Sequence, residues 1–182
     1  MLSVRERGET VATLRWIHVR LMETLASWVP TTPEMEVKLL FGAHIWDMAQ
    51  HADALGKRTH ELRMPLQHSL EPAEEYKNLL AEVSALTSTA ERISHFYDGI
   101  LPALAQRYRT YLERTDTLLD EPTVRILRHL MHEQERMIRE SRELLEQLPK
   151  LAAGNDSTEG FRGRESAIEQ FAVHREQAAV GA

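Results

Sequence analysis

Four ionisable side chains fall on one line along residues 33–62: Glu36, His44, Asp47 and His51. At about 100° per residue, their spacing returns to the same side of an α-helix. Apolar residues flank this line: Val37, Phe41, Ile45, Met48 and Ala52 on one side, and Leu39, Ala43 and Trp46 on the other. Ionisable groups in apolar surroundings are costly unless they bind one another, a metal ion or a ligand. We call this line the polar stripe and treat it as the candidate site.

The spacing within the polar stripe suits metal ligation. His44, Asp47 and His51 share one helix face, and His18 is the inward polar residue of the preceding helix. Two or three imidazoles and a carboxylate suit a single iron, manganese or zinc ion. In a metal-free enzyme, His44 and His51 would act as general bases and Asp47 would orient an imidazole. We therefore predict His44, Asp47 and His51 as catalytic residues, and these three with His18 as metal ligands.

A buried hydrogen-bond network without metal is the alternative interpretation of the stripe. In this network two carboxylates satisfy the neighbouring basic side chains, so that Glu36 and Asp47 pair with His18, His44 and Arg58. Histidine and aspartate at helical spacing are common, and no second motif accompanies them here. The sequence leaves both interpretations open.

Further polar residues are predicted to face the same interior from later helices. Arg107, beside Glu36 and Asp47, would pair with them or bind an anionic group of a substrate. Tyr108 is expected to pack with its hydroxyl at the rim. The alternating arginines and glutamates of residues 125–143 are expected to form a salt-bridged outer face. We assign substrate contacts to five side chains: Glu36, Tyr97, Arg107, Tyr111 and Gln134.

Composition limits the remaining possibilities. The 182 residues include no cysteine, which excludes disulfides and thiolate chemistry. A net charge of -6 and the lack of a Lys/Arg-rich block argue against a nucleic-acid partner. No apolar run reaches membrane-spanning length, and residues 1–7 are not followed by a signal-peptide core. We expect a cytoplasmic protein that binds neither nucleic acid nor membrane.

Hydrophobic periodicity predicts an all-α fold. The expected helices cover residues 3–29, 33–62, 73–86, 88–111 and 120–148, with a bend at Pro102. We expect one helical domain over residues 1–150. Residues 151–182 are expected to form a flexible tail, in which Ile168, Phe171 and Ala172 suggest a short docking helix.

Two helical hairpins joined by a long crossover, residues 63–87, form the connectivity of ferritin-like four-helix bundles. Residues 47–51 (DMAQH) and 133–137 (EQERM) also resemble the paired Glu-x-x-His stretches of the ferritin-like di-metal carboxylate superfamily. The resemblance covers about residues 10–148. It places the family's glutamates at Met48 and Gln134 and its histidines at His51 and Met137. Because only His51 keeps the ligand type, an ordinary di-iron centre is not expected.

Two functional hypotheses follow from these observations. The resemblance implies an oxidoreductase-type enzyme acting on a small organic substrate, here with a rearranged mid-bundle site that holds one metal ion or none. The alternative is a non-catalytic ferritin-like partner subunit or scaffold that has lost its metal centre. Apolar residues such as Trp16 on the outer side of the first helix suggest a homodimer or a partner protein.

Overall fold

The computed structural model describes residues 2–152, 156–169 and 171–172, and its regular elements are all helices. Within these residues, extended pairing is limited to an isolated bridge between Pro72 and Ala172. The prediction of an all-α chain is confirmed. The elements are α1 (Val4–Trp28), η1 (Val29–Thr31), α2 (Met35–Glu61), α3 (Glu74–Ser84), α4 (Thr89–Ile93), η2 (Ser94–Ile100), α5 (Leu101–Arg114), α6 (Glu121–Gln147), η3 (Pro149–Leu151) and α7 (Asp156–Ser166).

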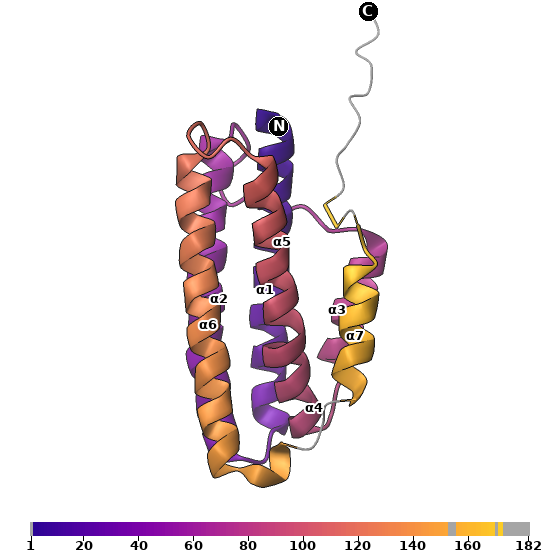
Figure 1. Ribbon diagram of the computed structural model, residues 1–182. Helices are drawn as coiled ribbons and strands as arrows, with labels where there is room; N and C mark the ends of the chain where they lie inside the picture. The colour runs from indigo at the N-terminus through magenta and orange to yellow at the C-terminus, as the bar shows by residue number, and fades with distance from the viewer. Residues whose placement is uncertain (1, 153–155, 170, 173–182) are drawn as a thin grey trace, which may run out of the picture.

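Four long helical segments lie side by side: α1, α2, the continuous α4–η2–α5 segment, and α6 (Figure 1). The chain runs down α1 and α6 and up α2 and α5. Helix α1 packs against α2, α2 against α6, and α6 against α5. Residues 62–88, which include α3, cross from the end of α2 to the start of α4. This crossover allows α2 and α5 to run in the same direction.

Local sequence signals explain how the first helix begins and how its far end packs. The Ser3 hydroxyl accepts from the Glu6 backbone N–H, and the Glu6 carboxylate accepts from the Ser3 N–H, forming a capping box. At the other end of α1, Trp28 is buried and its indole contacts the rings of Phe41 and Phe96. These aromatic contacts join α1, α2 and η2 in one apolar core.

Just before Pro102, where a bend is expected, the chain forms a π-helical segment, η2. Proline has no N–H, so it cannot bind the carbonyl four residues earlier, which belongs to Asp98. That carbonyl instead accepts a 2.7 Å hydrogen bond from Nε of Arg162 in α7. The backbone irregularity therefore provides a docking point for the C-terminal helix.

Helix α7 packs against α3, η2 and α5. Its Phe161 side chain is buried against Gly99, where an added Cβ would lie 3.1 Å from the ring. This helix ends at Ser166, before the apolar residues 168–172 that suggest a docking helix in the sequence. The remaining predicted tail residues, 153–155, 170 and 173–182, lie outside the described part of the chain.

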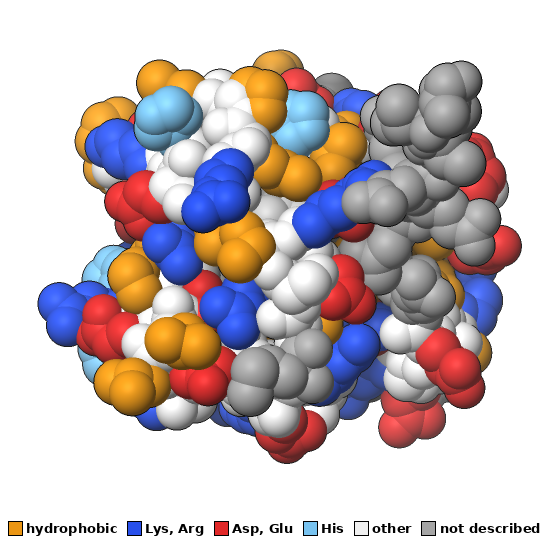
Figure 2. Space-filling view, turned by 90° about the horizontal axis from the view of Figure 1, so that it is seen from above, with side chains coloured by type: hydrophobic (Ala, Val, Ile, Leu, Met, Phe, Trp, Pro, Cys, Tyr) orange, Lys and Arg blue, Asp and Glu red, His pale blue; other side chains and the backbone are white. Residues whose placement is uncertain are grey.

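The described surface is mixed in character. On the end of the molecule shown in Figure 2, hydrophobic, basic and acidic side chains are interspersed. Helix α2 exposes three large apolar side chains, Met35, Leu39 and Trp46, each more than half exposed. No helix within the described residues is long and apolar enough to cross a membrane.

Candidate functional site

The polar stripe of α2 does not form one site. His44 and His51 are buried, Asp47 is half-buried, and Glu36 is exposed. Leu39 and Trp46, expected to flank the stripe inside the protein, lie on the surface. The stripe therefore follows one edge of the buried face of α2, so its residues meet different neighbours. The buried side chains of that face include Val37, Phe41, His44, Met48, His51 and Leu55.

One group of polar residues lies in the middle of the bundle, with one member from each long segment. This mid-bundle cluster consists of His18 (α1), His51 (α2), Tyr108 (α5) and Gln134 (α6), all at most 3% exposed. Nε2 of His18 lies 2.5 Å from the Tyr108 hydroxyl, and Nε2 of Gln134 donates to the same oxygen at 3.4 Å. The His18 and His51 rings meet edge to face, with centroids 5.1 Å apart. The expectation that Tyr108 places its hydroxyl at the rim is wrong, because this hydroxyl joins α5 to α1 and α6 in the interior.

Three buried atoms of the mid-bundle cluster have no hydrogen-bond partner among the described residues. They are Nδ1 of His18, Nδ1 of His51 and Oε1 of Gln134. Leaving a buried polar atom unpaired costs on the order of 1–3 kcal/mol, so native structures satisfy most of them. These three atoms come from three different helices and are suited to a ligand, an ion or water.

The mid-bundle cluster is uncharged at neutral pH. Burial lowers the pKa of His51 to about 4. Burial, together with repulsion from His51, lowers the pKa of His18 well below its ordinary value. Burial also raises the pKa of the Tyr108 phenol well above its usual range. Both imidazoles are therefore neutral, which is the form that offers a lone pair to a metal.

These residues do not fit the carboxylate-rich di-metal centre that the family resemblance implies. The corresponding positions on α2 and α6 carry the fully buried Met48 and Met137 and the amide Gln134. Within the described residues, no group of three or more His, Cys, Asp or Glu side chains is arranged to hold a metal ion. A site here would have to use imidazole, amide and thioether ligands.

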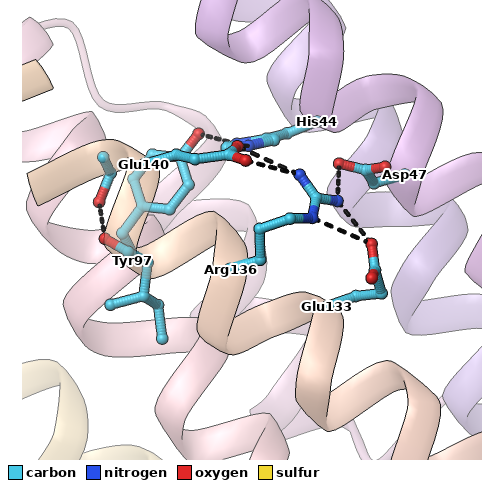
Figure 3. A network of polar contacts seen from close by, with 8 residues as sticks. His44, Asp47, Tyr97, Glu133, Arg136 and Glu140 are labelled. Atoms are coloured by element: carbon cyan, nitrogen blue, oxygen red, sulfur yellow. Dashed lines mark hydrogen bonds and ion pairs between the residues drawn. The ribbon is translucent and has the colours of Figure 1, made fainter. Parts of the chain in front are cut away.

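A second group of polar residues surrounds Arg136 of α6 (Figure 3). In this Arg136 network the guanidinium binds Asp47 of α2 at 2.9 Å, Glu133 at 2.6 Å and Glu140 at 3.0 Å. Burial opposes the charge of Arg136, but its carboxylate partners outweigh burial and raise its pKa. Asp47 is thus paired through a guanidinium with α6, not with an imidazole of its own helix.

Both ring nitrogens of His44 are occupied within the Arg136 network. Nε2 lies 2.8 Å from a Glu140 carboxylate oxygen, and Nδ1 lies 2.7 Å from the Tyr97 hydroxyl of η2 (Figure 3). Since hydrogen bonds from His44 and Arg136 outweigh burial and lower the pKa of Glu140, the ionised carboxylate accepts from Nε2–H. Nδ1 then accepts from Tyr97. Burial is also the main cause that lowers the pKa of His44, so the ring is held neutral in one tautomer.

A third group, the Asp120 cluster, lies at the other end of α6. The fully buried Asp120 carboxylate accepts from Arg58, Tyr111, Thr115 and Thr123. The metal-free interpretation of the stripe pairs Arg58 with its carboxylates, and the sequence predicts a substrate contact for Tyr111. Both instead satisfy this one buried carboxylate.

Arg107 lies away from all three groups. Its Nε donates to Glu165 of α7 at 2.9 Å, and its guanidinium stacks on Phe171. It therefore does not approach Glu36 or Asp47 in the described contacts. Periodicity alone placed Arg107 inward, but the neighbour on that side is the C-terminal helix.

Sequence reasoning gave no site role to four residues that define these groups: Tyr108, Asp120, Arg136 and Glu140. A signal for Tyr108 was available, because it lies on the same face as Leu104 and Tyr111, both of which are buried. Arg136 and Glu140 were placed on an outer face, and nothing local in the sequence indicates that their long side chains reach α2.

Comparison with known proteins adds no assignment, since no family model, curated protein or solved structure matches this chain.

Proposed function

We propose that this chain is a ferritin-like, oxidoreductase-type enzyme that holds a single metal ion in its mid-bundle cluster. One observation carries the proposal: two neutral imidazole nitrogens and an amide oxygen, buried on three helices, are left without partners. The direction of the four long segments and the crossover through α3 support the ferritin-like arrangement. The ligand set differs from the sequence prediction, because His44 and Asp47 are engaged elsewhere.

In this proposal each residue of the mid-bundle cluster has a distinct role. His18 and His51 would bind the ion through Nδ1, and Gln134 through Oε1. For Nδ1 of His18 to offer its lone pair, Nε2 must carry the proton and donate to Tyr108. Tyr108 is then a positioning residue that fixes the tautomer and the ring orientation. The bound metal would supply oxidation chemistry on a small organic substrate.

The Arg136 network would form the substrate side of the site. Asp47 and Glu133 are partly exposed, and their charges act on the His51 imidazole. Asp47 also precedes His51 by four residues, one turn along α2. Arg136 pairs with both carboxylates and would hold them at the edge of the site beside His51.

Metal analysis of the untagged protein tests this proposal. We expect about one transition-metal ion per chain, lost in His18→Ala and in His51→Ala. His44→Ala is the matched control, since it removes another buried histidine and is expected to retain the ion. A folded protein that contains no metal, or one that retains it in both His18→Ala and His51→Ala, would contradict the proposal.

A second candidate function is a non-catalytic ferritin-like partner subunit. The direct pairing of both His44 nitrogens and the exposed Met35, Leu39 and Trp46 favour it. This candidate predicts a stable apo-protein and self-association or partner binding that Trp46→Glu weakens.

A further inference from the structure

Two buried methionines share the helix faces that carry the mid-bundle cluster. Met48 precedes His51 by three residues on α2, and Met137 follows Gln134 by three on α6. Both side chains are fully buried. Residues three apart are neighbours on one helix face, so each thioether lies one turn from a polar member of the cluster.

The ligand atoms available here are therefore soft or neutral. They include two imidazole nitrogens without partners, two thioether sulfurs and one amide oxygen. Thioethers are poor ligands for hard cations such as Mg²⁺ and Mn²⁺ but favourable ligands for Cu(I). The nearby carboxylates of Asp47 and Glu133 are engaged by Arg136. The cluster thus offers no carboxylate of its own.

The charge of the ion also favours a monovalent over a divalent ion at this site. The cost of transferring an ion into a low-dielectric interior increases with the square of its charge, so a monovalent ion pays about a quarter of the divalent cost. A divalent ion bound only by neutral ligands carries two charges that no ligand compensates. A monovalent ion carries one.

We propose that the mid-bundle cluster selects a soft monovalent ion, Cu(I), with Nδ1 of His18, Nδ1 of His51 and the Met48 and Met137 thioethers as ligands, the thioethers taking the place of the harder Gln134 amide oxygen. This inference rests on the proposed function, because it names the metal that the same site holds. It concerns binding alone and includes no electron-transfer step.

The test is a competition titration of the full, untagged chain with Cu(I) and a chromophoric Cu(I) chelator, under anaerobic reducing conditions. We expect one Cu(I) per chain. Met48→Leu and Met137→Leu preserve side-chain volume and are each expected to lower the affinity by about tenfold or more. Met64→Leu is the matched control, since this methionine packs against Gly8 in the connection after α2. It should bind Cu(I) like the parent.

A second measurement uses only the parent protein, so it does not require any variant to fold. In the parent protein labelled at methionine methyl groups, one equivalent of Ag(I), a redox-inert substitute for Cu(I), should shift the Met48 and Met137 resonances and leave that of Met64 unchanged. Unshifted Met48 and Met137 methyls, or unchanged Cu(I) affinity in both leucine variants, would overturn the inference.

The outcomes separate the two proposals. Stoichiometric iron or manganese that depends on His18 and His51, without Cu(I) or Ag(I) binding, overturns the choice of a soft ion and leaves the proposed function standing. Failure to bind any of these metals overturns both.

Discussion

Nε2 of His18 lies 2.5 Å from the hydroxyl oxygen of Tyr108, and both side chains are fully buried. This contact joins α1 to α5, which are about 90 residues apart in the chain. The direction in which this contact is donated fixes which nitrogen of His18 carries the proton. A single phenol thus links the packing of the two helical hairpins to the chemistry available at the mid-bundle cluster.

Tyr108→Phe should therefore lower both stability and metal affinity. The change leaves Nε2 of His18 and the amide of Gln134 without their buried partner. We expect a loss of about 1–3 kcal/mol in the free energy of unfolding, measured by urea denaturation. Tyr76→Phe is the matched control, because Tyr76 is equally buried and its hydroxyl has no hydrogen bond to the described residues. Equal effects of the two substitutions would show that the Tyr108 hydroxyl contributes nothing specific.

Helical phase was sufficient to predict that His44 and His51 are buried, but not which residues they meet. The two lie seven residues apart on α2, so they sit at different levels of the bundle. His51 meets His18, whereas His44 meets Tyr97, which the π-helical turn of η2 presents. Which side chains meet at the same height along the bundle depends on how far neighbouring helices are shifted along their axes and on irregular backbone such as η2. The hydrophobic pattern of a single helix encodes neither.

The length of a side chain also limits how well helical phase predicts which residues it contacts. Arg136 starts from the edge of α6, yet its guanidinium reaches Asp47 on the neighbouring helix. The docking of α7 is equally non-local, since it depends on the Asp98 carbonyl and on the small Gly99. The all-helical fold is thus readable from periodicity, whereas the division of the stripe among separate polar groups requires the packed structure.

Acid should destabilise the protein through His51. Its folded pKa is about 4, below the ordinary value of 6.5, because burial disfavours the imidazolium. Between these values the unfolded chain binds more protons than the folded one, so stability falls as pH decreases from 6.5 to 4. His51 alone should remove about 3 kcal/mol over this range. Denaturation at several pH values should show a smaller pH dependence in His51→Gln, whereas His60→Gln, at an exposed histidine, should match the parent. A parent profile flat from pH 6.5 to 4 would contradict this.

Asp120 should be the least replaceable carboxylate of the described chain. Asp120→Ala removes the shared acceptor of four side chains and leaves the Arg58 guanidinium buried beside a cavity. Breaking such a buried pair costs on the order of 3–5 kcal/mol. The control is Glu121→Gln, which breaks an exposed pair with Arg125 and should change stability by about 0–1 kcal/mol. Thermal unfolding of both variants checks the contrast, and similar melting temperatures would refute it.

The docking of α7 should depend on Phe161 and not on the stability of the bundle itself. Phe161 is buried against Gly99 and the His95 ring, while Arg162 binds the carbonyl that Pro102 leaves free. Phe161→Ala creates a cavity worth about 3–5 kcal/mol, more than a short peripheral helix retains from its remaining contacts. Hydrogen exchange should therefore show lost protection in α7 and in the facing part of η2, with protection of α2 and α6 maintained. Gly163→Ala is the control, since an added methyl at this helical position has nothing within 4 Å and should leave exchange unchanged. Uniform loss of protection through all four long segments in Phe161→Ala would instead show that α7 is an integral part of the fold.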